Sequence, residues 1–307
     1  MIVLFTVVIP TFNRSSYLER CIRSLFREIQ GEPDIEVIVC DDGSSEDHQR
    51  ENGRICSEVD AVYCHIHNRG QAVARNAGVR RSSGEWIVFL DDDVEVFQGW
   101  YAVLKKKVKS APDDVVGLEG AVIPSGRGVW DREVQNLEGG LFLTCHIIYR
   151  RAVFDLVGGF DEDEIVRKAE DHHLAARVLK EGKVTFVPEL KVVHLPRTVH
   201  LCRYFRGAFR RMDELLCAEE SFFRKEPAAY GSFRYADTFW GTYSRLLFRH
   251  VISSLHRRGF RRLLSHPVQT FFLISTLLLE QLRAWMLLPG YMSRSTSARS
   301  NGKTGRC

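Results

Sequence analysis

The chain has 307 residues, of which 27% are charged and 45% are hydrophobic. This composition is that of a globular protein and excludes a disordered or collagen-like chain. The length predicts one large domain or two modest ones. None of the eight cysteines forms a CxxC pair, which favours a reduced, cytoplasmic protein over a disulfide framework.

Charge is distributed unevenly along the chain. Residues 1–199 carry 25 basic and 32 acidic residues, a net charge of −7, whereas residues 200–307 carry 18 and 7, a net charge of +11. The two parts therefore predict different partners, and the basic part favours an anionic one.

The first hundred residues alternate apolar runs with helical patterns. Helices are expected at Ser15–Glu28 and Gln71–Arg81, and strands at Leu4–Ile9, Ile35–Cys40, Ala61–His65 and Trp86–Leu90. The apolar run that begins at Ile2 lacks a basic flank and a cleavage site, so it predicts a buried strand and not a signal peptide. Alternation with short links predicts a doubly wound, mainly parallel, Rossmann-like α/β sheet. In such sheets ligands bind at the carboxyl ends of the strands.

The pattern loosens after residue 110. Expected in order are a strand at Val115–Ile123, a glycine-rich loop at Pro124–Gly140, the segment Leu141–Arg150, a helix at Ala169–Glu181, and short strands at Val184–Val187 and Val192–His194. The remainder is helical in pattern, aromatic and rich in arginine. We expect an α/β domain over 1–200, a basic helical region over 201–292 and a disordered tail over 293–307.

Acidic and turn-forming residues follow three of the expected strands. Pro10–Arg14 follows the first strand, and Asp41-Asp42-Gly43-Ser44 follows the second. Taken alone, the former is typical of a turn and the latter of a helix cap. Asp91-Asp92-Asp93 is different, because three adjacent carboxylates repel one another and a cap needs one. A bound Mg²⁺ or Mn²⁺ would compensate, and these ions favour one or two carboxylates together with phosphate oxygens.

Two later features are ambiguous by themselves. Glu170-Asp171 opens an expected helix, where carboxylates also favour the helix dipole. His194 ends an expected strand, where a lone histidine is usually structural, although an acidic metal site would gain from a neutral ligand.

Together these residues match a known pattern. It comprises Val8–Arg14, Asp41–Ser44, Asn68-Arg69-Gly70 with Ala74–Gly78, Gly84 through Asp93, Gly158–Asp161 and Glu170-Asp171. Their order and spacing resemble family 2 glycosyltransferases, which are inverting enzymes of the GT-A fold. The resemblance covers about Val3 to His194. It implies a nucleotide-sugar donor and a divalent metal ion.

The resemblance assigns donor contacts to four residues. It implies that Thr11 and Asp42 hold the nucleotide base, with Pro10 in the same donor site. It also implies that Arg75 approaches the base or the diphosphate.

The resemblance further assigns the metal and the base. Asp93 would bind the metal ion, Asp92 the ribose, and Asp91 would support them. Asp171 matches the general base that deprotonates an acceptor hydroxyl. His194 matches a position that contacts the metal or the diphosphate in some members.

One position departs from the family pattern. Where members commonly have Gly-x-Asn-x-Ala, this chain has Thr144-Cys145-His146-Ile147-Ile148, so His146 stands at the usual asparagine. The departure leaves open what contacts the donor sugar and the acceptor there.

The basic region after residue 199 lies outside the resemblance. The segment 268–288 has the length of a membrane span, but Glu280, Gln281 and Arg283 interrupt it. An interfacial helix on an anionic membrane and a helix buried against the catalytic domain both fit this pattern. No motif supports nucleic-acid binding, and none is expected. Membrane contact would suit a lipid-linked or polysaccharide acceptor and a cytoplasmic protein peripheral to the inner face of the membrane.

The sequence thus predicts an inverting, metal-dependent glycosyltransferase that uses a UDP-sugar, with dTDP and GDP as alternatives. A nucleotidyltransferase is the second hypothesis, but it needs a glycine-rich, lysine-bearing loop that Pro10–Arg14 lacks. A degenerate protein that binds glycans or membranes is the third, and it predicts eroded acidic motifs.

Overall fold

A computed structural model of the chain describes residues 4–125, 131–132, 134–163 and 170–198. The chain divides into two compact units. One comprises Met1–Ser125 and Glu133–Pro196, and the other Gly126–Arg132 and Arg197–Cys307. In the second unit, β7 (Asp131–Arg132) pairs antiparallel with β10 (Arg197–Thr198). The predicted basic helical region and disordered tail lie outside the described residues.

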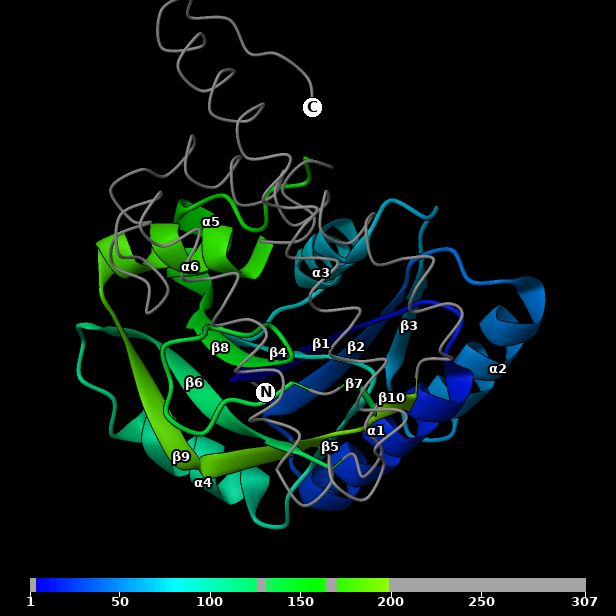
Figure 1. Cartoon of the computed structure of the whole chain (residues 1–307), viewed down its shortest axis with the longest axis horizontal. Helices are drawn as coiled ribbons and strands as arrows, with labels where there is room; N and C mark the ends of the chain where they lie inside the picture. Colours follow the sequence, from blue (N-terminus) through cyan, green and yellow to red (C-terminus); the bar gives the residue numbers. More distant parts are fainter. Residues whose placement is uncertain (1–3, 126–130, 133, 164–169, 199–307) are drawn as a thin grey trace, which may run out of the picture. The chain divides into compact units, whose positions relative to one another are not determined.

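The first unit is built on one eight-stranded sheet (Figure 1), with the order β3-β2-β1-β4-β8-β6-β9-β5. Four neighbouring pairs are parallel, namely β1–β2, β1–β4, β2–β3 and β6–β9, and three are antiparallel. The strands are β1 (Phe5–Thr11), β2 (Ile35–Asp41), β3 (Val62–His65), β4 (Trp86–Leu90), β5 (Val94–Val96), β6 (Val115–Pro124), β8 (His146–Arg150) and β9 (Lys183–His194).

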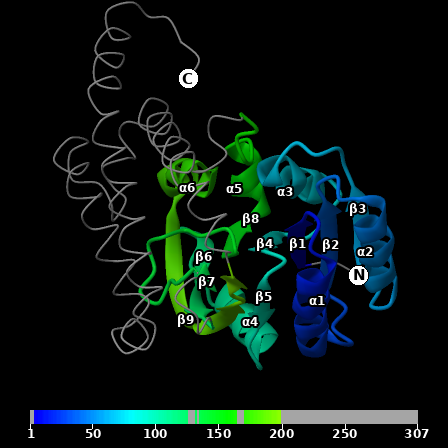
Figure 2. The same ribbon diagram turned by 45° about the vertical axis from the view of Figure 1, so that its right-hand side comes forward.

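Helices cover both faces of this sheet (Figures 1 and 2). One face carries α1 (Ser15–Ile29), α2 (Glu46–Ser57) and α4 (Trp100–Lys109). The other carries α3 (Gln71–Arg80), α5 (Arg151–Leu156) and α6 (Glu170–Glu181). This two-sided cover explains why the central strands are apolar along their whole length.

Strand β1 shows how the sequence determines this packing. All seven of its residues are buried. Because successive side chains of a strand point to opposite faces, Phe5, Val7 and Ile9 join the core under α1 and α4. Val8 joins the core under α3 and α5. Within α1, the buried positions recur at helical spacing, which confirms the predicted helix to within one residue at its end.

The structure differs from the sequence predictions beyond β4. The two short strands predicted at 184–187 and 192–194 form one strand, β9, which is irregular where Gly120 pairs with Val187 and Ala121 with Lys191. A local bulge therefore separates two halves of β9, and the sequence pattern predicted each half as a strand of its own. The segment Leu141–Arg150 is a strand from His146 onward.

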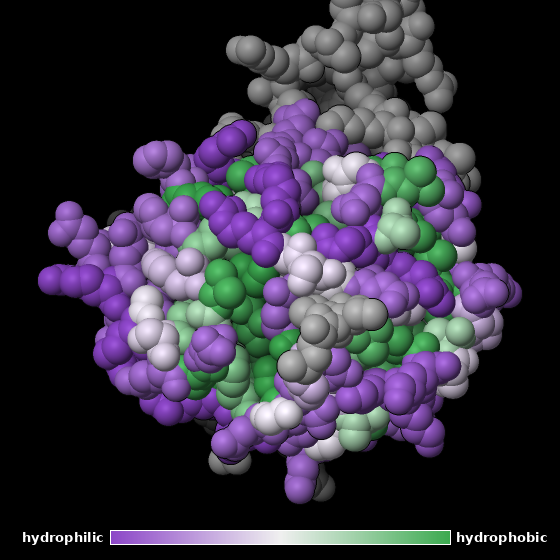
Figure 3. Space-filling model, turned by 180° about the vertical axis from the view of Figure 1, so that it is seen from behind, coloured by the Kyte–Doolittle hydropathy of each residue, from purple (hydrophilic) through white to green (hydrophobic). Residues whose placement is uncertain are grey.

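Two observations concern surface properties. Within the described residues, no helix combines the length and the apolar character that crossing a bilayer requires. The face shown in Figure 3 mixes hydrophilic and hydrophobic residues. The large apolar side chains that are exposed, such as Leu156 and Val62, come from separate elements. Single exposed apolar side chains need no special explanation.

Helix α3 packs so closely on the sheet that it requires glycine. A Cβ atom at Gly78 would lie 2.5 Å from Val8 Cγ1 and 3.2 Å from Cys40 Sγ. We expect Gly78→Ala to lower the free energy of unfolding by about 1–2 kcal/mol, because overpacking outweighs the gain in helix propensity.

Gly53 in α2 is the matched control. A Cβ atom there would meet Tyr63 at 3.9 Å, an ordinary contact. Gly53→Ala should therefore raise the free energy of unfolding by roughly 0.5–1 kcal/mol. Urea unfolding measures both changes, and a change of the same sign in the two variants would contradict the close packing of α3.

Candidate functional site

The parallel pairing of the first strands gathers polar residues at one edge of the sheet. Thr11 is the register partner of Asp41, and β4 runs parallel to β1 on its other side. Because the carboxyl ends of parallel strands lie at the same edge, the residues that end β1 and β2 and those that follow β4 meet there. This is the edge at which the sequence predicted a ligand.

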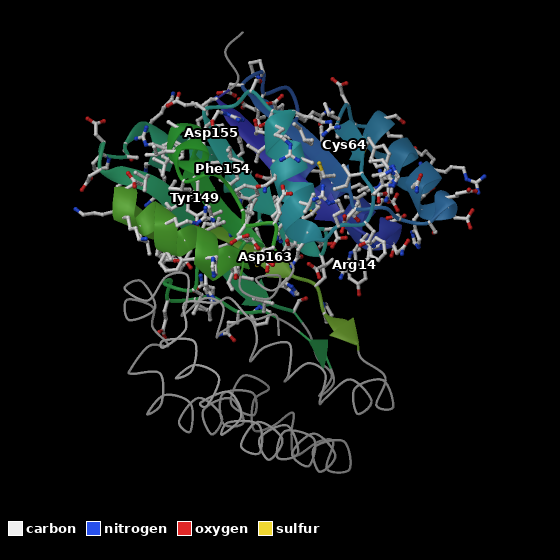
Figure 4. The ribbon with its side chains drawn as sticks, turned by 90° about the horizontal axis from the view of Figure 1, so that it is seen from above. Arg14, Cys64, Tyr149, Phe154, Asp155 and Asp163 are labelled. Carbon is white, nitrogen blue, oxygen red and sulfur yellow. The ribbon has the colours of Figure 1, made fainter. Side chains whose placement is uncertain are left out.

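Asp92 occupies the middle of this edge. Its Oδ2 accepts a hydrogen bond from Thr11 Oγ1 at 2.8 Å, and its Oδ1 accepts one from Arg14 Nη1 at 3.0 Å. Burial raises the pKa of the Asp92 carboxyl to about 6, although the charge of Arg14 opposes the shift. Arg14, labelled in Figure 4, also lies 3.8 Å from Asp93 Oδ2 and is about one-third exposed. It is a site residue that the sequence analysis did not single out, although it stands in the first motif.

The two aspartates after β2 have different surroundings. Asp41 is fully buried and accepts hydrogen bonds from the Ser44 amide, Asn52 Nδ2 and Tyr63 Oη. Its role is therefore to hold the β2 end, α2 and β3 together.

Asp42 joins β2 to the start of α3. Its carboxylate accepts hydrogen bonds from the backbone amides of Arg69 and Gly70, both at 2.8 Å. Gly70 immediately precedes α3 and has a φ of 99°, a conformation that glycine adopts without strain. Asp42 therefore holds the turn that leads into α3, and neither α2 nor α3 has a side-chain hydrogen bond at its N-cap.

Asp93 and His194 meet because β5 pairs with β9. Val94 is the register partner of His194, and the Leu195 amide donates to the Asp93 carbonyl at 2.7 Å. Asp93 Oδ1 then lies 3.7 Å from His194 Nε2, and both side chains are buried. The sequence analysis named both residues, and the structure brings them together.

These two residues fit the protein part of a divalent-metal site. No cluster of three or more His, Cys, Asp or Glu side chains suited to a metal ion occurs in the described parts of the chain. His194 Nδ1 is buried and has no hydrogen-bond partner among the residues described. Mg²⁺ and Mn²⁺ commonly take one or two protein ligands and complete their shell with phosphate oxygens and water, so Asp93 and His194 suffice when a diphosphate is present.

Arg75 contacts the first residue of the acidic motif that follows β4. Its side chain is 1% exposed, and its Nη2 donates to Asp91 Oδ1 at 2.7 Å while its Nη1 lies 3.4 Å from Glu170 Oε1. The guanidinium also stacks 5.5 Å from the centre of the Phe160 ring. The structure thus connects Arg75 with the acidic motif after β4 and with the start of α6.

Glu170 and Asp171 open α6 but differ in exposure. The Glu170 side chain is 5% exposed, whereas that of Asp171 is 20% exposed. Burial, reinforced by the charge of Asp171, raises the pKa of Glu170 to about 7. Asp171 Oδ1 accepts a hydrogen bond from the His172 amide at 2.9 Å. Asp171 is therefore the more accessible carboxylate of the pair.

His146 has a structural role. Trp100 Nε1 donates to His146 Nε2 at 2.9 Å, which leaves the proton on Nδ1 to donate to the Ala121 carbonyl at 3.1 Å. The ring fills the space next to Gly120, where an added Cβ atom would lie 2.1 Å from it. Burial lowers the pKa of His146 to about 4. The departure from the family pattern is thus accommodated inside the core.

Comparisons with known proteins point to one family. The model of the family described as "Glycosyl transferase family 2" matches residues 6–160. A GalNAc(5)-diNAcBac-PP-undecaprenol beta-1,3-glucosyltransferase of Campylobacter jejuni is 33% identical over 115 residues, which are 36% of this chain and 37% of that protein. A pre-mycofactocin glycosyltransferase of Mycobacterium tuberculosis is 30% identical over 212 residues, 63% of this chain and 43% of that one. The chain thus spans less than half of these relatives' length.

Solved structures share the fold. The mannosyltransferase PcManGT of Pyrobaculum calidifontis, determined with GDP-Man and Mn²⁺, has a TM-score of 0.60 and 19% identity, covering 92% of this chain and 86% of that one. TarS of S. aureus in complex with UDP-GlcNAc has a TM-score of 0.55 and 14% identity, covering 94% and 92%. The predicted GT-A α/β fold is confirmed.

The buried His146 predicts a pH dependence of stability. Its pKa is about 4 in the folded chain and near 6.5 when unfolded, so the unfolded state binds more protons between these values. The free energy of unfolding is therefore highest above pH 6.5 and decreases as the pH falls towards 4. At pH 5 the loss relative to pH 7 should be about 2 kcal/mol.

His146→Asn isolates this contribution, because asparagine does not titrate. We expect urea unfolding to give a smaller loss of stability between pH 7 and pH 5 in the variant than in the wild type. Equal losses in the two proteins would show that His146 is not held neutral in the core.

Proposed function

The chain belongs to glycosyl transferase family 2, and we propose that it transfers a sugar from a nucleotide sugar to an acceptor hydroxyl with inversion at the anomeric carbon. One observation carries the proposal. The buried Asp93–His194 pair lies at the same sheet edge as the Thr11–Asp92 contact, and this edge is joined to Asp171 through Arg75 and Glu170. A donor site and a base are thereby built into one framework.

We propose that the nucleotide binds over the ends of β1 and β2. The resemblance assigns this role to Pro10, Thr11 and Asp42, with Asp92 on the ribose and Asp91 in support. We add Phe12 to this proposed site, because it follows Thr11 and is 41% exposed. An exposed aromatic ring offers a flat apolar face on which a base can stack. We propose a UDP-sugar as the donor. Relatives in fold have been determined with GDP-Man and with UDP-GlcNAc.

We propose that Asp93 and His194 hold Mg²⁺ or Mn²⁺ together with the donor diphosphate. A bound cation offsets the negative charge that develops on the leaving diphosphate. Arg14, which already lies near Asp92 and Asp93, adds a second positive charge on the exposed side of the site. Both charges favour a diphosphate over an uncharged ligand.

Asp171 is the general base of the proposed reaction. The acceptor oxygen attacks the anomeric carbon from the face opposite the diphosphate and forms the new glycosidic bond. The bond to the diphosphate breaks, its electron pair leaves with the phosphate oxygen, and the acceptor proton passes to Asp171. The partial exposure of this carboxylate leaves it accessible to an acceptor.

The proposed acceptor is a lipid-linked or other glycan. The name of the Campylobacter relative includes an undecaprenol-linked acceptor, which supports this class. We propose catalysis in residues 1–200, and contact of the basic region 201–292 with an anionic membrane surface at its cytoplasmic face. The proportion of basic residues after position 199 supports the proposed contact with the membrane.

A thermal-shift screen of nucleotides tests the donor site. We expect UDP or another nucleoside diphosphate to raise the melting temperature in Mn²⁺ but not in EDTA, because a ligand of the native state stabilises it by mass action. Asp93→Asn should abolish the metal-dependent part of the shift. Glu95→Gln, two residues away at a partly exposed position that pairs with Arg20, is the control and should retain it. A metal-dependent shift that survives in Asp93→Asn would contradict the assignment of the metal ligand.

Asp171→Asn tests the base. We expect transfer, measured as release of the nucleotide from the selected donor, to fall by 100-fold or more, since a positioned general base contributes about 10²–10⁴ in rate. Binding of the nucleotide with Mn²⁺ should remain within about twofold of the wild type. Unchanged turnover would remove Asp171 from this role, and a folded wild type that binds no nucleotide would favour the non-enzymatic hypothesis.

A further inference from the structure

Helix α3 joins every acidic motif of the site to one framework. At its start, the Arg69 and Gly70 amides bind Asp42. The next residue, Gln71, donates from Nε2 to Glu170 Oε1, and Arg75, four residues on, lies near the same oxygen. Positions i and i+4 of a helix share one face, so both side chains reach Glu170 together.

Arg75 connects segments that are far apart in sequence. It pairs with Asp91, 16 residues away, and with Glu170, 95 residues away. A guanidinium group offers several N–H donors in one plane and can bridge two carboxylates, whereas a lysine ammonium is a single point charge. Arg75 therefore bridges the residue that follows β4 and the first residue of α6.

The burial of Arg75 argues against a direct donor contact. Its side chain is 1% exposed, both Nη atoms face carboxylates, and one face of the guanidinium covers Phe160. Its Nε is also buried, although it has no hydrogen-bond partner among the described residues. A nucleotide would therefore reach the guanidinium only by opening this cluster, and separating the charges in it is costly. The family resemblance alone placed this arginine next to the base or the diphosphate.

The position of Glu170 explains how such a pair would act on the chemistry. Successive residues of an α-helix are rotated by about 100°, so Glu170 and Asp171 cannot point the same way. Glu170 points into the buried cluster and thereby fixes the rotation of α6 about its axis. Asp171, one residue on, is then turned towards the more exposed side.

We propose that Arg75 and Glu170 form a positioning pair, which orients Asp171 relative to the metal residues, and that Arg75 does not bind the donor. The inference rests on the proposed function and makes its site more specific. Asn76 supports the same framework, because its side-chain amide bonds both the amide and the carbonyl of Phe160, against which Arg75 packs.

Arg75→Lys separates positioning from donor binding. We expect the affinity for UDP and GDP, measured by calorimetry in Mn²⁺, to stay within about twofold of the wild type. Turnover should fall by about 100-fold, the effect that a misplacement of 1 Å has on reacting groups. Turnover is measured as nucleotide release from UDP-glucose, UDP-N-acetylglucosamine and GDP-mannose. Weakened nucleotide binding with normal turnover at saturation would overturn the proposal.

Arg80→Lys is the matched control on the same helix. Arg80 is 60% exposed and lies 3.6 Å from Glu162, so this variant should behave as the wild type in both measurements. Circular dichroism and the melting temperature establish that each variant is folded.

Glu170→Gln and the double variant provide a test that does not depend on Arg75 alone. Glutamine retains the size of Glu170 but removes its charge. Since both residues act through one contact, the double variant Arg75→Lys/Glu170→Gln should lose no more turnover than the worse single variant. If the turnover losses of the two single variants multiply in the double variant, the two residues act independently and the proposed positioning pair is overturned.

Hydrogen exchange gives a readout that needs no substrate. In Arg75→Lys, the amides of the second turn of α6, which are the first with hydrogen-bond acceptors inside the helix, should exchange faster, while those around Asp42 and Arg69 should not. Unchanged exchange in α6 would overturn the proposed positioning. A wild type that binds neither nucleotide would instead overturn the proposed function, so the two failures are distinguishable.

Discussion

The main constraint on this structure is the accumulation of buried carboxylates at one edge of the sheet. Parallel strands place their ends together, and this chain ends or follows them with aspartates. Each buried charge must find a partner because desolvation is costly. Asp41 is satisfied by donors from three neighbouring segments, Asp42 by two backbone amides, and Asp92 by Thr11 and Arg14. The hydrogen-bond and ion-pair partners of each carboxylate distinguish the structural aspartates from those available to a ligand.

This distinction gives adjacent residues different roles. Asp41 and Asp42 look alike in sequence, yet the first has no exposed surface and three side-chain or backbone donors, while the second holds the start of α3. Likewise, Asp93 faces the His194 imidazole across 3.7 Å, whereas Asp91 pairs with Arg75. Arg14 differs from the buried partners, because its side chain is partly exposed. Under the proposed function it can exchange a carboxylate for a phosphate at little cost in desolvation.

The sequence predicted those features that depend on local pattern. Strands β1, β2 and β4 are buried on both faces, so their apolar runs located them to within two residues and placed Thr11 and Asp91–Asp93 at their ends. Short or weakly patterned elements were not predicted: β5 has three residues, and α4 has three lysines in its last turn. The partners of Asp42 and of His146 lie on other elements, and no local pattern encodes which elements will meet.

The same reasoning explains why the motif around Arg75 could be assigned to ligand binding from the sequence. Arg75 lies in an alanine-rich helix without a local counter-charge, and the family resemblance alone assigned it to the donor. The fold supplies Asp91 and Glu170 instead, from segments 16 and 95 residues away. A sequence motif can therefore contain residues that hold other motifs in place and do not themselves bind a ligand. Under the proposed function, the contacts that set specificity then fall to more accessible residues such as Phe12 and Arg14, whose surroundings can vary without disturbing the buried framework.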